Sequence, residues 1–211
     1  THGTPMVAGC MDASAAMLAT GAKVGQILHV SGSTDALLIC TDKPKPHEKL
    51  LTCPVGAGKQ WMSISTIAAA GSALTWAHQT FFADLSSETF HKLAGQLARN
   101  PGPSTVGFAP YLAGDRMTIE QPRAAFVGLT LGTGREEMLR AIIQSLAAAS
   151  ASRIPLLKQN NAIRLLPDVV TTGGVQRVLD EVLHRGWPKN WKYRAIAEAT
   201  LLGLAELLVP E

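Results

Sequence analysis

The residues of this chain best suited to chemistry lie in three short polar segments: Asp12, a turn at 31–35 and a turn at 171–174. The last of these ends the segment 166–176 (LPDVVTTGGVQ), where an apolar run is followed by two threonines, two glycines and an amphipathic stretch. This order predicts a strand, a tight turn and a helix N-terminus. Glycines in such a turn bring backbone N–H groups close to a bound phosphate or nucleotide. Close packing of the helix on the strand is the structural alternative.

The turn at 31–35 (SGSTD) lies between two apolar runs, 27–30 and 36–41, which together predict a β-hairpin. Gly32, Ser33 and Thr34 offer backbone N–H groups and two hydroxyls, which suit phosphate oxygens. A plain hairpin turn uses the same residue types. For this segment alone, the plain turn is the favoured interpretation.

Asp12 stands where a loop is expected to meet a helix N-terminus. Aspartate is favoured there as a cap, because its carboxylate accepts hydrogen bonds from the first N–H groups of the helix. The same carboxylate could act as a general base that takes a proton from a substrate hydroxyl, if it is held within hydrogen-bond reach. The sequence leaves both interpretations open.

Other catalytic and metal-binding patterns are incomplete. The segment 56–60 (GAGKQ) fails as a phosphate-binding P-loop, because Cys53 stands where that motif needs glycine and Gln60 where it needs serine or threonine. The six histidines are scattered, without H-E-x-x-H or paired Cys/His spacing, so we expect no metal site built from side chains. The G-x-S-x-G motif of hydrolases is also missing.

Length and composition bound the class of protein. The 211 residues are 46% hydrophobic, enough for one domain with a substantial core, and the Pro/Gly loop near residue 101 is expected to lie inside that domain. The net charge is +3 and the basic residues are scattered, which disfavours a nucleic-acid partner. No apolar run reaches the ~18 to 20 residues of a membrane span and no signal peptide is apparent, so we expect no membrane partner and a cytoplasmic location.

The cysteines and the first residue add two expectations. Cys10, Cys40 and Cys53 are odd in number and lack C-x-x-C spacing, so they are expected to be buried free thiols in a reducing compartment. The sequence starts at Thr1, and its first residues resemble the interior of a protein. We expect a piece of a longer protein, with an ordinary processed N-terminus as the alternative.

Periodicity and turn residues predict alternating strands and helices. Strands are expected at 5–9, 27–30, 36–41, 50–53, 61–64, 106–112, 124–129 and 163–171, and helices at 12–21, 66–82, 87–98, 133–157, 176–184 and 194–208. Ser86 or Ser87 is expected to cap the third helix, and Thr133 with Glu136 matches the capping-box spacing of the fourth. Strands come first and alternate with helices later, which favours an α/β or α+β fold with a mixed sheet.

Taken in order, seven segments resemble motifs in the C-terminal domain of the FGGY family of carbohydrate kinases, which includes xylulokinases, gluconokinases and glycerol kinases. They are PMVAGCMD (5–12) beside P-V-V-A-G-G-G-D, SGST (31–34) beside L-G-T-S, AGSALTW (70–76) beside A-G-x-x-x-x-W, FAPYLAGDR (108–116) beside F-x-P-Y-L-x-G-E-R, AFVGLT (125–130) beside A-F-x-G-L-x, TGG (172–174) beside T-G-G-G, and 198–203 beside the closing E-A-x-x-x-G-A-A helix. The resemblance covers nearly the whole chain. Its P-Y-L-x-G-[ED]-R string favours the xylulokinase and gluconokinase side.

The resemblance implies an α/β fold of the actin-like ATPase (ribonuclease H-like) type, with a mixed sheet flanked by helices. It implies that residues 1–211 form the nucleotide-binding C-terminal domain, and that the N-terminal sugar-binding domain is absent from this chain. ATP and Mg²⁺ would bind in a cleft between the two domains. The implied partners are a sugar of pentulose or hexonate type and that N-terminal domain, and a homodimer is a further expectation.

The resemblance also implies roles for residues. Asp12 would be the general base that deprotonates the sugar hydroxyl as it attacks the γ-phosphate. Gly32, Ser33 and Thr34 would contact the phosphates. The residues that would frame the adenosine are Gly71, Thr75, Thr172, Gly173 and Gly174.

The sequence departs from the family pattern at the site itself. Cys10 and Met11 replace two glycines before the base, and Ala13 stands where the family usually has Asn or Gln. Asp35 replaces a glycine and is expected to bring a negative charge near the ATP oxygens, and Val175 replaces the third glycine of T-G-G-G. An ATP-dependent sugar kinase remains the favoured function, and these changes support an alternative, a catalytically weakened relative that acts as a nucleotide- or sugar-binding regulatory module. Without the N-terminal domain, the isolated chain is expected to show no sugar kinase turnover.

Overall fold

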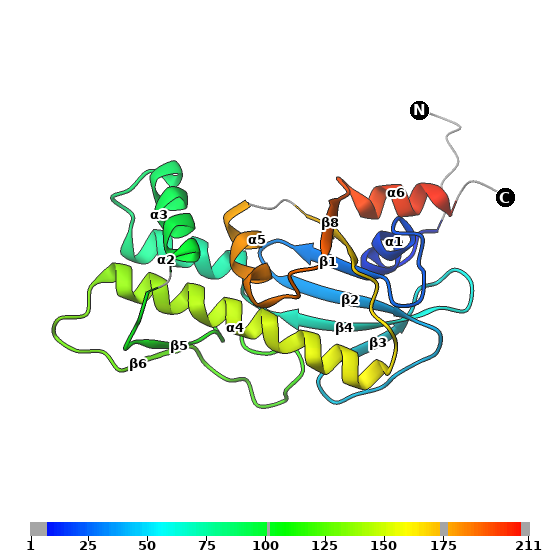
Figure 1. Cartoon of the computed structure of the whole chain (residues 1–211), viewed down its shortest axis with the longest axis horizontal. Coiled ribbons are helices and arrows are strands. Elements are labelled where there is room, and N and C mark those ends of the chain that lie inside the picture. Colours follow the sequence, from blue (N-terminus) through cyan, green and yellow to red (C-terminus); the bar gives the residue numbers. More distant parts are fainter. Residues whose placement is uncertain (1–7, 101, 174–176, 208–211) are drawn as a thin grey trace.

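The computed structural model describes residues 8–100, 102–173 and 177–207, and its centre is a six-stranded sheet of order β3-β4-β2-β1-β7-β8 (Figure 1). The strands are β1 (Ile27–Ser31), β2 (Asp35–Thr41), β3 (Leu51–Pro54), β4 (Trp61–Ile67), β7 (Asp168–Thr172) and β8 (Lys192–Ala195). The pairs β3–β4, β4–β2 and β2–β1 are antiparallel, whereas β1–β7 and β7–β8 are parallel. The sheet is therefore mixed, as predicted.

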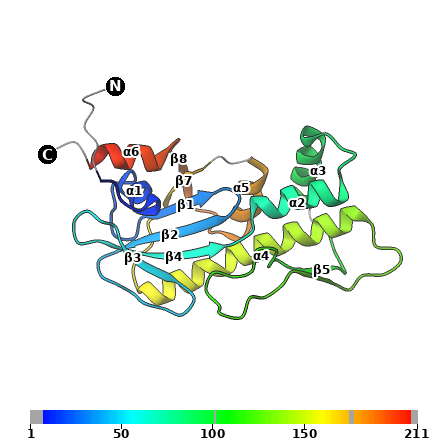
Figure 2. The same cartoon turned by 180° about the vertical axis from the view of Figure 1, so that it is seen from behind.

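Helices cover both faces of the sheet and extend past one end of it. They are α1 (Asp12–Leu18), α2 (Gly71–Phe81), α3 (Ser87–Arg99), α4 (Arg135–Asn161), α5 (Arg177–Leu183), the short 3-10 helix η1 (His184–Gly186) and α6 (Ala199–Glu206). Figures 1 and 2 show α1 and α6 together on one face and the long α4 on the other, with α2 and α3 beyond the sheet. A separate two-stranded sheet, β5 (Gly107–Ala109) with β6 (Ala125–Val127), contacts α4.

The central strands alternate between two apolar cores. Leu28 of β1 packs in the core shared with α1 and α6, whereas its neighbour Ile27 packs in the core beneath α4. Successive side chains of a strand point to opposite faces of the sheet. Because both faces are covered at the centre of the sheet, β1 and β2 are mostly buried and apolar. A third apolar cluster joins α2, α3, α4 and α5 beyond the sheet.

Two predicted helices begin later than expected. The prediction at 66–82 is wrong at its start, because Thr66 and Ile67 continue β4 and pair with Ala36 and Asp35 of β2. The prediction at 194–208 is also wrong at its start, because residues 192–195 form β8 beside β7 and α6 begins at Ala199. In both places, pairing with a neighbouring strand overrides the local helical pattern.

The predicted caps have different outcomes. Ser86 caps α3 as predicted, and its hydroxyl accepts a hydrogen bond from the N–H of Thr89 at 3.2 Å. The predicted capping box of Thr133 and Glu136 is wrong. The cap position of α4 is Gly134, which has no side chain to accept a hydrogen bond from the first turn. The Thr133 hydroxyl instead accepts a hydrogen bond from a backbone N–H of the preceding loop at 2.9 Å.

Three further expectations concern the first strand, the cysteines and membrane spans. The strand predicted at 5–9 falls mainly outside the described residues, and positions 8 and 9 belong to no strand. Cys40 is buried and free, as predicted, but Cys10 and Cys53 are only half-buried. Burial raises the pKa of Cys40 to about 11 and also raises that of Cys53. Within the described ranges, no helix combines the length and the apolar character that crossing a membrane requires.

Candidate functional site

The turn between β1 and β2 is anchored to the start of α2 by backbone hydrogen bonds. The Gly32 carbonyl accepts from the Gly71 N–H at 3.0 Å. The Ser33 carbonyl accepts from the Ala70 and Ser72 N–H groups at 3.0 and 3.1 Å, and from the Ser72 hydroxyl at 2.9 Å. These N–H groups are among those that a helix N-terminus leaves without intrahelical partners. The turn is therefore fixed through its carbonyl groups rather than its side chains.

Gly71 permits this close approach between the turn and α2. A Cβ atom at Gly71 would lie 2.5 Å from the Gly32 carbonyl oxygen, which is closer than real Cβ contacts. The side chain of Ser33 is exposed, and Thr34 is half-buried. The structure thus brings Gly32 and Ser33 together with Gly71.

The end of β7 brings the second predicted turn beside the first. β7 pairs in parallel with β1, and Gly173 follows its last residue, Thr172, with a φ of +122°. A Cβ atom at Gly173 would overlap the carbonyl oxygen of Ser31, so glycine is required both for conformation and for space. Ligands of open α/β sheets bind at such carboxyl ends of strands. Gly174 and Val175, the other predicted positions of this turn, lie outside the described residues.

We call Gly32, Ser33, Gly71 and Gly173 the glycine junction. Thr75 is exposed on α2 one turn after Gly71, and its hydroxyl donates to the Gly71 carbonyl at 3.2 Å. Residues four apart share a helix face, so Thr75 lies on the same side of α2 as Gly71. The Thr172 hydroxyl accepts from the N–H of the first residue of α6 at 3.4 Å. Thr172 thus joins β7 to α6.

Asp12 is the first residue of α1, and its side chain is exposed. Its Oδ1 accepts from the Ala13 N–H at 2.7 Å, and no other hydrogen bond of its side chain occurs among the described residues. The cap position of α1 belongs to Met11, so the interpretation of Asp12 as the N-cap is wrong. α1 is held against α6 at a point where a Cβ atom on Gly203 would overlap the Ala15 carbonyl oxygen. The helix therefore has a fixed position, with an open carboxylate in its first turn.

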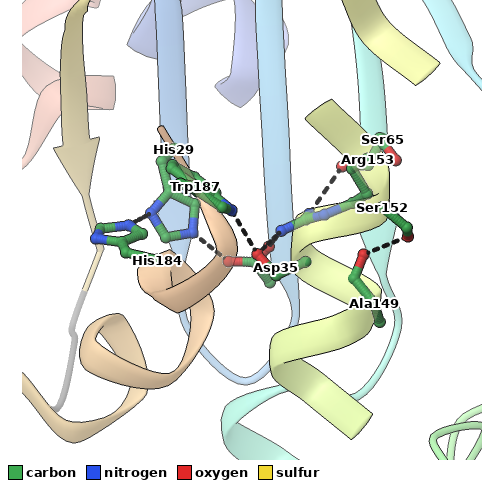
Figure 3. A network of polar contacts seen from close by, with 9 residues as sticks. His29, Asp35, Ser65, Ala149, Ser152, Arg153, His184 and Trp187 are labelled. Atoms are coloured by element: carbon green, nitrogen blue, oxygen red, sulfur yellow. Dashed lines mark hydrogen bonds and ion pairs between the residues drawn. The ribbon is translucent and has the colours of Figure 1, made fainter. Parts of the chain in front are cut away.

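The structure corrects the prediction for Asp35. Its side chain is fully buried and is paired with His29 and Arg153 (Figure 3). Burial raises the pKa of Asp35, but Arg153 and then His29 outweigh burial and hold that pKa below its usual value. Arg153 comes from α4 and also donates to the Ser150 hydroxyl at 3.1 Å. The charge of Asp35 is therefore neutralised inside the protein and is not exposed at the turn of residues 31–34.

His29 connects this pair to the end of α5. Its Nδ1 lies 2.9 Å from Nε2 of His184, and both rings contact Trp187, with centroid separations of 5.1 and 4.4 Å. Burial, followed by the neighbouring His29, lowers the pKa of His184 to about 3. We call His29, Asp35, Arg153 and His184 the buried polar network. Sequence spacing gave no signal for it, because the two histidines are 155 residues apart.

Two pockets lie next to these groups. One of about 370 Å³ is lined by Thr171, Asp180, Glu181, His184 and Tyr193, directly before the turn at Thr172. Another of about 320 Å³ has Arg153 in its wall and includes Tyr111, Gly114 and Asp115 of the motif at 108–116. The first of them therefore reaches the buried polar network at His184.

Comparison with known proteins shows which family this chain resembles. Residues 28–178 match the model of the C-terminal domain of the FGGY family of carbohydrate kinases. Gluconokinase from Bacillus subtilis is 31% identical over 154 residues, which cover 67% of this chain and 30% of the relative. Xylulose kinase from Staphylococcus xylosus is 33% identical over 107 residues, which cover 50% of this chain and 21% of the relative. The chain thus spans 30% or less of the length of these two relatives.

Solved structures of such kinases share the fold. Xylulose kinase from Rhodospirillum rubrum superposes with a TM-score of 0.77 at 20% identity, covering 98% of this chain and 43% of that one. Glycerol kinase from Plasmodium falciparum, solved with ADP, has a TM-score of 0.72 at 22% identity, covering 93% and 40%. The mixed sheet flanked by helices is therefore the actin-like ATPase fold, as predicted. Because the family model covers most of the chain, this protein belongs to the FGGY family of carbohydrate kinases.

Proposed function

We propose that this chain supplies the nucleotide-binding half of an ATP-dependent carbohydrate kinase, and that a separate N-terminal domain supplies most of the sugar site. The observation that carries the proposal is the glycine junction, where Gly71 lies against Gly32 and Gly173 lies against Ser31. Neither contact leaves room for a Cβ atom, so backbone packs against backbone there, and Ser33 and Gly173 are exposed beside it. Such a surface suits phosphate oxygens and the edge of a nucleoside.

ATP with Mg²⁺ is the proposed cofactor, and the residues present fit it. Gly32, Ser33 and Thr34 would hold the phosphates, and the adenosine would lie against Gly71, Thr75, Thr172, Gly173 and Gly174. Bound ATP supplies the phosphoryl group, and Mg²⁺ neutralises its charge. The contribution of this chain is positioning. Because the turn at 31–34 is already fixed on α2, its backbone need not reorganise when the nucleotide binds.

We propose a pentulose or a hexonate as the sugar, because matched relatives are named xylulose kinase and gluconokinase. A cytoplasmic location belongs to the same proposal, since ATP and reduced thiols such as the three free cysteines are found there. One argument for the alternative function, a regulatory module, no longer holds. The charge of Asp35 no longer opposes phosphate binding, because Arg153 and His29 pair with it inside the protein.

Asp12 is the proposed general base. Oδ1 is engaged by the Ala13 N–H, which leaves Oδ2 to take the proton of a sugar hydroxyl. In the intact kinase, Asp12→Asn should lower kcat by about 10²- to 10⁴-fold and leave nucleotide affinity unchanged. Asp42→Asn, at another exposed position, is the matched control. Unchanged turnover of Asp12→Asn would remove Asp12 from this role. Coupled ADP release with pentoses and hexonates should show no turnover by the isolated chain.

Nucleotide binding by the 211-residue chain tests the proposal directly, with Mg²⁺-ADP titrated in a calorimeter. Gly71→Ala should weaken binding by about tenfold or more, because its Cβ pushes the turn at 31–34 away from α2. Gly134→Ala is the matched control, since no atom lies within 4 Å of a Cβ there and the backbone φ is −91°. Thermal unfolding checks that both variants are folded. Equal affinities of the two folded variants would contradict the proposed site.

A further inference from the structure

Three side chains beside the glycine junction have the donor atoms of a metal site. His29 comes from β1, Asp180 from α5 and His184 from η1. One ligand atom of each lies within 4.8 Å of the other two. Figure 3 shows the rings of His29 and His184 facing each other, with His29 reaching toward Asp35 on its other side.

Asp35 and Arg153 already orient His29 as a ligand. Nε2 of His29 faces the Asp35 carboxylate, which is itself paired with Arg153. An anionic carboxylate accepts a hydrogen bond, so Nε2 is the donor nitrogen, and in the neutral ring Nδ1 carries the lone pair. Histidines that bind metals generally donate their second N–H to a carboxylate in this way. The lone pair on Nδ1 points toward His184.

The Asp180 carboxylate lies near His29 and the Ser31 side chain. Its Oδ1 is buried and has no hydrogen-bond partner among the described residues. A buried polar atom without a partner costs free energy and calls for an explanation, such as an ion. The pocket of about 370 Å³ that Asp180 and His184 line gives an ion access from the surface and leaves room for a water ligand.

We propose that His29 Nδ1, His184 Nε2 and the Asp180 carboxylate bind one divalent transition-metal ion, with Zn²⁺ the best match. Two imidazoles and a carboxylate suit Zn²⁺ better than Mg²⁺, which prefers oxygen ligands. Tetrahedral ligands at Zn²⁺ are about 3.4 Å apart, so the three side chains need only small adjustments. His184 needs to carry its hydrogen on Nδ1, which is the other neutral tautomer. The ion would fasten α5 and η1 to β1, next to Gly173.

Metal titration of the chain, after treatment with a chelator, tests this site. Calorimetry with Zn²⁺ should show one ion per chain. Asp180→Asn and His184→Gln should each lower the affinity by about tenfold or more. His91→Gln on α3, away from the cluster, is the matched control and should bind like the unaltered chain. Asp180→Asn keeps the shape of the side chain, so it decides the question if His184→Gln fails to fold.

Co²⁺ absorption distinguishes this site from binding at cysteines. The site predicts visible bands of a four-coordinate ion without a thiolate charge-transfer band, and the visible bands should weaken in Asp180→Asn. A thiolate band would place the ion at the half-buried Cys10 or Cys53 and overturn the proposal. The absence of stoichiometric binding, or equal affinities for Asp180→Asn and His91→Gln, would overturn it as well.

Discussion

The glycine junction and the buried polar network share strands β1 and β2 but are built in opposite ways. At the junction, backbone atoms meet backbone atoms, and glycines exclude side chains from the contacts. In the network, charged and polar side chains meet, and Asp35 and His29 are fully buried. The exposed region has its polar groups on the backbone, whereas the buried region has them on side chains from β1, β2, α4 and η1.

This difference separates two tasks. A surface that lets a nucleotide approach the backbone must be bare, so it can tolerate the loss of individual side chains. A buried charge pair cannot tolerate the loss of a side chain, because the remaining partner is left as an uncompensated charge in a medium of low polarity. Removal of one side chain should therefore have a large effect on stability in the network and a small one at the junction.

The largest effect is expected for Arg153→Met. This change keeps much of the buried side-chain volume but leaves the carboxylate of Asp35 without its strongest partner. The free energy of unfolding should fall by about 3–5 kcal/mol, measured by urea denaturation. Arg99→Ala is the control, because Arg99 pairs with Glu181 at the surface, where such a pair contributes about 1 kcal/mol or less. Similar losses in the two variants would break the comparison.

A smaller effect is expected for Ser72→Ala at the junction. The variant removes the hydroxyl that donates to the Ser33 carbonyl but keeps the two backbone hydrogen bonds to that carbonyl. Urea denaturation should show a loss of about 1 kcal/mol, and Mg²⁺-ADP affinity should change less than in Gly71→Ala. A loss as large as that of Arg153→Met would mean that side chains, and not the backbone, hold the turn.

The two regions also differ in what the sequence reveals. Gly71 and Gly173 could be recognised from the sequence because close contact with a backbone carbonyl requires glycine at both positions. The network could not be recognised from the sequence, since its side chains come from β1, β2, α4 and η1 and converge only in the folded chain. In the sequence, Asp35 was interpreted as an unpaired charge at the turn. Its partner Arg153 lies 118 positions later, so the pairing was not visible there.

Fold prediction failed where pairing decided the outcome. The alternation of strands and helices predicted a mixed sheet correctly, yet residues 66–67 and 194–195 were assigned to helices. Their local pattern is helical, and only the neighbouring strands β2 and β7 draw them into the sheet. The predicted cap of α4 was wrong by one residue, because Gly134 occupies the cap position expected for Thr133.

The central claim is that a nucleotide binds at the glycine junction, and the most direct measurement is amide NMR of the 211-residue chain during titration with Mg²⁺-ADP. The account predicts saturable shifts at Gly32, Ser33, Gly71 and Gly173, the residues where the two turns meet. The amides of Tyr111 and Asp115, in the pocket beside Arg153, should stay in place. Shifts confined to that second pocket, or no saturable shift at the junction, would contradict the account.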